Sequence, residues 1–490
     1  MQLTFDMMAP LMFGGLIVFM LIGFPVAFSL AAVGLFFGLI SIEQGFFGAI
    51  YLQNLPLRIF GIMSNDLLLA IPFFTFMGAV LERCGLAEDL LEGTGQLFGS
   101  VPGGLAYAVI VVGAILGAIT GTVAASVIAM GMISLPIMIR YGYDKKLATG
   151  VIAASGTITQ LIPPSLVLVV LADQLGRSVG DMYKGAIGPS ILQTVIFALY
   201  ILALSIWKPS MMPPLPPEAR TLRGWPLYSR VMWGMVPSVV LIFLVLGTIF
   251  MGLATPTEAG AMGAVGAIVL AAAHRRLTWP LIRQGMGTTM RITSMVIYIL
   301  IGSTVFSLVF QGVDGPLWIE HLLAKLPGGA TGFLIFTNIF VFFLAVFLDF
   351  FEIAFIIIPL LAPVADKMGI DLIWFGVLLC VNMQTSFMHP PFGFALFYLR
   401  GIAPPSIKSS EIYWGAIPWV FLQIVLVVIV IFWPESVTYW LDKGTGIDPA
   451  TVNMDLPTID YGSPEQTPTG EAPKEEGETD DDPDAPPPRN

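Results

Sequence analysis

The chain has 490 residues, of which 56% are hydrophobic and 11% are charged, and its mean hydropathy is +0.85. This composition excludes a soluble globular domain and predicts an all-α polytopic membrane protein. The net charge of −11 arises mostly at the C-terminal end, where residues 460–490 contain ten acidic and two basic residues.

The first apolar run begins near residue 11 and is too long for a cleavable signal peptide, and no basic segment precedes it. We therefore expect it to remain as a membrane anchor. Stretches long enough to cross a hydrocarbon layer of about 30 Å recur as far as residue 433. Helical spans are predicted at 11–40, 67–82, 103–139, 147–172, 185–207, 232–252, 256–273, 291–311, 331–366, 370–400 and 412–433.

The longest polar interruption is the proline-rich segment 207–231, which contains four basic residues and one acidic residue. The positive-inside bias predicts that this linker is cytoplasmic. It separates a first half, residues 1–206, from a second half, residues 232–442. Residues 443–490 are acidic, rich in proline and poor in apolar residues, which predicts a disordered tail.

One pattern, P-x5-G-x-D-x18-P-P, occurs twice at an offset of 227 residues. Internal duplication with spans interrupted at matching positions is typical of secondary transporters, whose binding site lies between the repeats. We expect two structural repeats, and by analogy with such transporters we expect them to be inverted. The pattern residues are Pro136, Gly142, Asp144, Pro163 and Pro164 in the first half, and Pro363, Gly369, Asp371, Pro390 and Pro391 in the second.

Each proline pair removes two N–H donors and moves the preceding residue out of the α region, so both helices should open there. In hydrocarbon, non-helical backbone survives only where protein or a water-filled cavity covers it. Exposed carbonyl oxygens with nearby hydroxyls and amides suit a hard monovalent cation, and we predict about two Na⁺ sites. The alternative is a pair of structural kinks satisfied by their own side chains. The polar residues before the breaks are Ser155, Gly156, Thr157, Thr159 and Gln160, and Asn382, Gln384, Thr385 and Ser386.

The segments 103–139 and 331–366 are too long for one crossing and too short for two, which predicts re-entrant helical hairpins. The first should turn where Gly121, Thr122 and Ser126 gather, and the second at Asp349 and Glu352. Acids three residues apart share a helical face. An acid within a span is a functional hypothesis, so we place both in the second ion site, with a purely structural role as the alternative.

His389 directly precedes the second proline pair. It either contacts a proton or substrate, or caps free carbonyls at the break. Cys84 and Cys380 form no CxxC motif, so neither a disulfide framework nor a metal site is expected from them. We predict no catalytic residues, no cofactor other than the coupling ion, and no nucleic-acid partner.

Three segments together resemble the large membrane subunit of TRAP (tripartite ATP-independent periplasmic) transporters: GLATPTEAGA, GYDKKLATGVIAASGTITQLIPPS and GIDLIWFGVLLCVNMQTSFMHPPFGFALF. The resemblance covers about residues 10–435. It implies a carrier of the bacterial inner membrane that works with a small four-helix membrane subunit and a periplasmic binding protein, with sodium driving uptake of a small organic solute by an elevator movement.

Carried onto this chain, the resemblance implies two ion-site regions. The first joins Gly121–Ser126 to Ser155–Thr157, and the second joins Asp349–Glu352 to Asn382–Ser386. The chain departs from the family pattern in having His389 before the second proline pair, and TGTVAAS rather than a serine-rich run at the first hairpin tip.

Two other functions remain open at this point. A stand-alone divalent-anion/sodium symporter would share hairpins, breaks and duplication but would need no partner. An intramembrane protease would use acids such as Asp349 and Asp144, but the chain has neither GxGD nor HExxH. We therefore expect a carrier rather than an enzyme.

Overall fold

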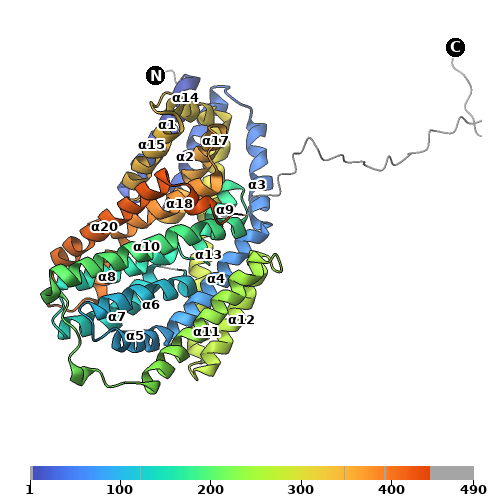
Figure 1. Ribbon diagram of the computed structural model, residues 1–490. Helices are drawn as coiled ribbons and strands as arrows, with labels where there is room; N and C mark the ends of the chain where they lie inside the picture. The colour runs from blue at the N-terminus through green and yellow to red at the C-terminus, as the bar shows by residue number, and fades with distance from the viewer. Residues whose placement is uncertain (1–3, 122, 347, 391–392, 442–490) are drawn as a thin grey trace, which may run out of the picture. The chain divides into compact units, whose positions relative to one another are not determined.

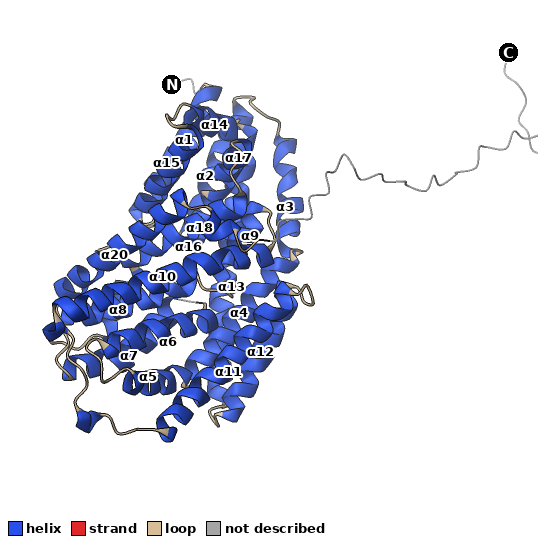
Figure 2. Cartoon of the chain, viewed as in Figure 1, coloured by secondary structure: helices blue, strands red, loops and turns tan. Residues whose placement is uncertain are grey.

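A computed structural model describes residues 4–121, 123–346, 348–390 and 393–441, and every regular element among them is a helix (Figures 1 and 2). This confirms the predicted all-α membrane fold. Thr122 and Pro391 lie outside the described residues, and so does the predicted tail, residues 443–490.

The first half of the described chain contains ten α-helices. They are α1 (Phe5–Ile22), α2 (Val26–Glu43), α3 (Asn54–Met63), α4 (Asp66–Arg83), α5 (Leu86–Leu97), α6 (Gly104–Thr120), α7 (Val123–Arg140), α8 (Lys145–Thr157), α9 (Leu166–Leu175) and α10 (Val179–Trp207). Short 3₁₀ segments are η1 (Ala49–Gln53), η2 (Ile158–Gln160), η3 (Pro209–Met211) and η4 (Pro217–Ala219).

The second half follows the irregular segment 208–224. Its helices are α11 (Trp225–Phe250), α12 (Pro256–Ala273), α13 (Trp279–Gly312), α14 (Gly315–Ala324), α15 (Gly329–Leu344), α16 (Phe350–Ile356), α17 (Ile358–Lys367), α18 (Leu372–Met383), α19 (Phe394–Ile402), α20 (Ser409–Phe432) and α21 (Glu435–Thr438). The 3₁₀ segment η5 (Gln384–Met388) continues α18.

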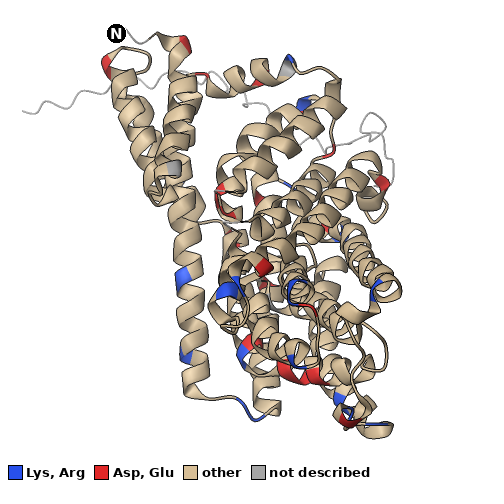
Figure 3. Cartoon of the chain, turned by 90° about the vertical axis from the view of Figure 1, so that its left-hand side faces the viewer, with Lys and Arg blue, Asp and Glu red and all other residues tan. Residues whose placement is uncertain are grey.

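Seven of the described helices are long and apolar enough to cross a membrane, or eight if α3 and α4, bent by 48°, count as one span. Charged side chains are sparse along these helices (Figure 3). The multi-pass membrane assignment therefore holds by length and composition.

The prediction of one helix over residues 11–40 is wrong. The chain leaves α1 at Gly23, which adopts the left-handed conformation of a helix C-cap, and enters α2 after Pro25. A Gly-Phe-Pro sequence ends one helix and starts another, so the apolar run forms two elements.

Three further differences concern shorter or amphipathic helices. The sequence analysis missed α3, α5 and α14, none of which is a long uninterrupted apolar run. Helix α11 begins at Trp225, so the end of the predicted linker is helical, and α13 begins at Trp279, earlier than the predicted 291. Thr255 and Glu258 start α12 as a capping box.

Small residues bring several helices into backbone contact. A Cβ atom on Gly150 of α8 would lie 2.2 Å from the carbonyl oxygen of Gly415 in α20, and one on Gly415 would lie 2.2 Å from that of Lys146. Close approach through small residues is the usual means by which helices associate in lipid. It fixes α20 against α8, beside the first proline pair.

The two halves have the same order of elements around their proline pairs. In the first, α6, a break, α7, α8 and η2 precede α9. In the second, α15, a break, α16 with α17, α18 and η5 precede α19. The inverted relation of the two segments and the elevator movement remain predictions.

Candidate functional site

At the first proline pair the chain is not α-helical between Thr157 and Leu166. The Gln160 carbonyl accepts a hydrogen bond from the Ser165 hydroxyl (2.5 Å). The Ser190 hydroxyl of α10 lies 3.1 Å from the Leu161 carbonyl and 2.6 Å from the Ala186 carbonyl, and its one proton serves one of them at a time. A protein hydroxyl thus engages the Gln160 carbonyl, which Pro164 leaves without its helical donor, as the structural alternative expects.

The second break also carries hydroxyls that donate to carbonyls three residues earlier. Thr385 donates to the Asn382 carbonyl (2.7 Å) and Ser386 to that of Met383 (2.6 Å). Thr157 does the same with Ala154 in the first break (2.8 Å). Because each hydroxyl uses its proton on the backbone, its oxygen presents lone pairs to whatever lies next to it.

A buried amide cluster joins the two breaks. Gln193 of α10 donates to the Gln384 side-chain oxygen (2.6 Å), and Gln423 of α20 donates to the same oxygen (3.4 Å). Gln423 also donates to the Thr157 hydroxyl (3.1 Å). One amide nitrogen therefore touches both predicted ion-site regions. We call Gln193, Gln384 and Gln423 the glutamine cluster.

The sequence analysis did not select Gln193 and Gln423. Each is an amide within a long apolar span, and that isolation was the available signal. Their partners lie about 190 and 40 residues away along the chain, so sequence spacing could not identify them.

Several oxygens around the breaks are buried and have no hydrogen-bond partner among the described residues: Ser155 Oγ, Gln160 Oε1, Gln193 Oε1 and Gln423 Oε1. Leaving a polar atom buried and unpaired costs about 1–3 kcal/mol, so each requires a ligand, a water or a functional reason. In the described part of the chain no group of three His, Cys, Asp or Glu residues could hold a metal. The available ligands are neutral oxygens, which fit a monovalent cation better than a divalent one.

The first hairpin packs directly on the first break. Helices α6 and α7 both contact α8, and they run side by side in Figure 1. Gly113 and Gly117 of α6 face Ser155 and Thr159, where an added Cβ would come within 2.7–2.8 Å of existing atoms. Gly121 ends α6 with φ +61°. The buried residue Ser126 belongs to α7.

Asp349 and Glu352 form a capping box at the start of α16. The Glu352 carboxylate accepts from the Asp349 N–H (2.9 Å), and the Asp349 side chain accepts from the Glu352 N–H. Among the described residues, no hydrogen bond links either acid to Asn382–Ser386. The observed contacts thus give the two acids a structural role at the hairpin tip, and ion binding by them remains a prediction.

His389 packs edge-to-face on Phe342 of α15, with ring centroids 4.1 Å apart. Both ring nitrogens are buried and have no partner among the described residues. Its position places it between the second break and the second hairpin. Among the described residues the ring therefore caps no carbonyl, and the substrate contact stays a prediction.

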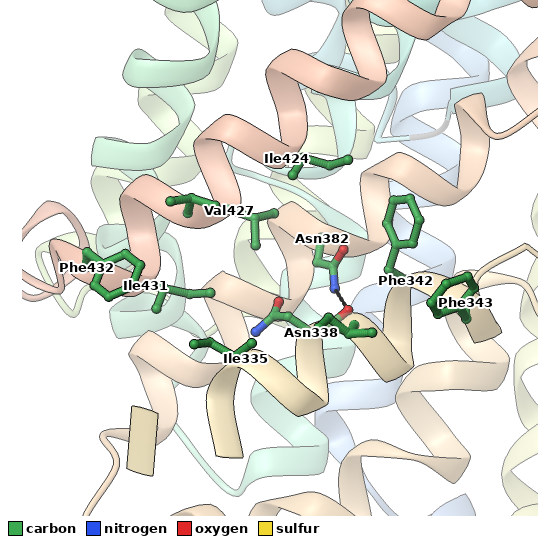
Figure 4. Close-up of a pocket in the computed structure, with 11 residues that line it drawn as sticks. Ile335, Asn338, Phe342, Phe343, Asn382, Ile424, Val427, Ile431 and Phe432 are labelled. Carbon is green, nitrogen blue, oxygen red and sulfur yellow. Dashed lines mark hydrogen bonds between the residues drawn. The ribbon is translucent and has the colours of Figure 1, made fainter. Parts of the chain in front are cut away.

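A cavity of about 450 Å³ opens beside the second break, between α15, α18 and α20 (Figure 4). Asn382 lies at its wall and donates to the Asn338 carbonyl (2.7 Å). The remaining lining side chains are apolar, including Phe342, Ile424 and Phe432. None of the described residues that line it is cationic.

The residues nominated for a protease are helix caps. The Asp144 carboxylate accepts from the Leu147 N–H (3.1 Å), and Asp349 caps α16. The Tyr143 hydroxyl accepts from the Leu105 N–H (3.2 Å), and burial raises the pKa of Tyr143 to about 12. These side chains are committed to the backbone rather than arranged as a pair of acids around a water.

Comparison with known proteins gives one family. The family model described as "Tripartite ATP-independent periplasmic transporter, DctM component" matches residues 13–436. The C4-dicarboxylate TRAP transporter large permease protein of Rhodobacter capsulatus is 29% identical over 445 residues, covering 87% of this chain and 97% of that protein. An isethionate TRAP transporter permease protein of Oleidesulfovibrio alaskensis is 28% identical, covering 87% of this chain and 65% of that protein.

Among solved structures, the YdaH transporter of Alcanivorax borkumensis superimposes with a TM-score of 0.55 at 15% identity, covering 78% of this chain and 87% of that one. At this identity the likeness supports the fold alone. The matched sequence relatives are permeases rather than enzymes, in agreement with the sequence analysis.

Proposed function

The chain belongs to the DctM-component family of tripartite ATP-independent periplasmic transporters, and from this premise we propose that it carries an organic acid into the cell together with sodium ions. It is a multi-pass protein of the inner membrane, and its family implies a small membrane subunit and a periplasmic binding protein as partners. A stand-alone symporter is disfavoured because the relatives are named as subunits of tripartite systems.

The solute class is supported by the relatives' names. C4-dicarboxylates and isethionate are both organic anions, although each name describes only the relative that bears it. Sodium coupling is supported by the unpartnered oxygens beside two broken helices, Ser155 Oγ and Gln160 Oε1 at the first and Gln193 Oε1 and Gln423 Oε1 in the glutamine cluster. In the proposed mechanism, sodium stabilises the breaks and the hairpin tips, which completes a solute site between them, and the repeat-bearing domain then slides across the membrane.

Uptake into proteoliposomes containing all three components tests this proposal. A tenfold inward sodium gradient provides about 1.4 kcal/mol per ion, so two coupled ions support about hundredfold accumulation and one supports about tenfold. We expect accumulation near the higher value, and none when potassium replaces sodium. Equal uptake with and without the sodium gradient would disprove the coupling.

Replacing Ser155 by alanine should weaken sodium binding without destabilising the fold. Ser155 is fully buried, and its hydroxyl oxygen has no hydrogen-bond partner among the described residues. Removing this hydroxyl therefore breaks no hydrogen bond among those residues. Loss of one oxygen ligand is expected to raise the sodium concentration for half-maximal uptake about tenfold.

The matched control is Ser41→Ala in α2. Its hydroxyl is also buried and without a partner among the described residues, but it lies outside both breaks. Sodium dependence should be unchanged in this variant. An equal shift in both variants, or no shift in Ser155→Ala, contradicts the assignment of Ser155.

A further inference from the structure

A second cavity of about 450 Å³ differs from the apolar one in its chemistry. It lies between α3, α4, α9, α13 and α17, and its lining is rich in polar side chains. These include Arg58, Asn65, Asp173, Ser303, Ser307 and Gln311. We call it the Arg58 cavity.

Arg58 is exposed to the cavity, and its guanidinium has one side-chain partner among the described residues. Its guanidinium donates to the Gln311 side-chain oxygen (2.9 Å), and within the described chain it forms no ion pair. The Asp173 carboxylate in the same cavity keeps its negative charge, but its two oxygens accept from neutral amides, one from Asn65 (2.8 Å) and the other from Gln174 (2.9 Å), rather than from Arg58. A guanidinium has five N–H donors, so Arg58 retains donors for a bound anion.

The wall of the cavity includes α17 and is bonded to α16. The Ser303 hydroxyl of α13 donates to the Phe355 carbonyl of α16 (2.6 Å), and Pro359 of α17 lines the space. A ligand in the Arg58 cavity would therefore touch both α13 and α17.

The cavity and the basic turn at Arg275 and Arg276 lie at opposite ends of α4 and α13. The guanidinium of Arg276 lies against Gly85, just after α4 ends, and α13 begins three residues after Arg276. Asn65 precedes the opposite end of α4, and Gln311 lies at the opposite end of α13. If the basic turn is cytoplasmic, as the positive-inside bias predicts, the cavity faces the periplasm.

We propose that the Arg58 cavity is an outer access site, in which Arg58 binds the carboxylate of the arriving solute and Gln311 orients the guanidinium. This assignment rests on the proposed transport of an organic acid. To that function it adds Arg58 as the cation that binds the solute, the periplasmic side as the place of entry, and a contact of the bound solute with α17.

The test is chemical labelling, which does not depend on transport. Ser307→Cys places a thiol in the cavity wall, and both native cysteines are buried. In the full chain in cells, with the outer membrane permeabilised, membrane-impermeant anionic and cationic methanethiosulfonates are compared by their rates of reaction with this thiol. Arg58 should favour the anionic reagent. Arg58→Gln should lower the ratio of anionic to cationic rates at least about fivefold, and Arg58→Lys should largely preserve it.

The matched control is Arg177→Gln, which removes the same charge from an exposed arginine shortly after α9 that does not line the cavity. The ratio should be unchanged. The proposal is wrong if Arg58→Gln leaves the ratio of anionic to cationic labelling rates unchanged. It is also wrong if the thiol reacts only with reagent added from the cytoplasmic side.

Transport then separates this proposal from the proposed function. In the three-component assay, with a solute that the wild-type system accumulates, Arg58→Gln should raise KM for the solute about tenfold or more. A change confined to the apparent affinity for the binding protein would make Arg58 a docking residue and overturn the access site. If uptake does not depend on sodium but Arg58 still favours labelling by the anionic reagent, only the sodium coupling is disproved.

Discussion

Replacing Gln384 by leucine is expected to destabilise the protein by about 1–3 kcal/mol and to abolish most uptake. The replacement removes the one oxygen that accepts from both Gln193 and Gln423. The side-chain N–H of Gln193 then has no acceptor. The side-chain N–H of Gln423 keeps only the Thr157 hydroxyl as its acceptor. A buried donor left without an acceptor costs about 1–3 kcal/mol, because no water replaces the lost bond.

The control for Gln384→Leu is the triple replacement of the glutamine cluster by leucine. When all the partners become apolar together, no donor is left unpaired, so stability should recover in large part. Uptake should remain low, because the side-chain oxygens of the glutamine cluster, which lie between the two breaks, are gone. Unfolding of the purified chain and uptake in proteoliposomes measure the two effects separately. A triple variant that transports like the wild type would reduce the cluster to a structural role.

Replacing Gly150 by alanine should cost at least about 3 kcal/mol. The new Cβ would lie 2.2 Å from the Gly415 carbonyl oxygen, far inside van der Waals contact, and the obstacle is backbone rather than a flexible side chain. Helices α8 and α20 must then separate. Because Thr157 belongs to α8 and Gln423 to α20, their hydrogen bond should weaken with the packing. Overpacking costs of about 1–3 kcal/mol apply where side chains can yield, and here they cannot.

Gly247→Ala in α11 is the matched control for Gly150→Ala. No atom lies within 4 Å of a Cβ built at Gly247, so the change should be neutral or stabilising by up to about 1 kcal/mol through helix propensity. Yield and thermal unfolding of the membrane-extracted chain compare the two variants. Similar stability of both would show that α8 and α20 tolerate separation.

The broken helices show how far sequence reasoning reached, whereas the re-entrant hairpins remain predictions. Two proline pairs and two segments of intermediate length indicated where helices are interrupted, because proline removes backbone donors wherever it occurs. The same reasoning failed for residues 11–40, where one apolar run contains two helices. It also missed α3, which carries Arg58, because a ten-residue amphipathic helix has no long apolar run to mark it.

The sequence by itself determined the membrane class, the family resemblance, the duplicated proline pairs and the polar residues beside them, since these follow from composition and from local backbone chemistry. Only the tertiary structure decided the partners. It joined Gln193, Gln384 and Gln423 across the two halves, closed Asp349 and Glu352 into a capping box, and brought Arg58 to Gln311. The physical reason is that a buried polar atom is satisfied by whichever group packing brings within hydrogen-bond distance, and that group can come from any part of the chain.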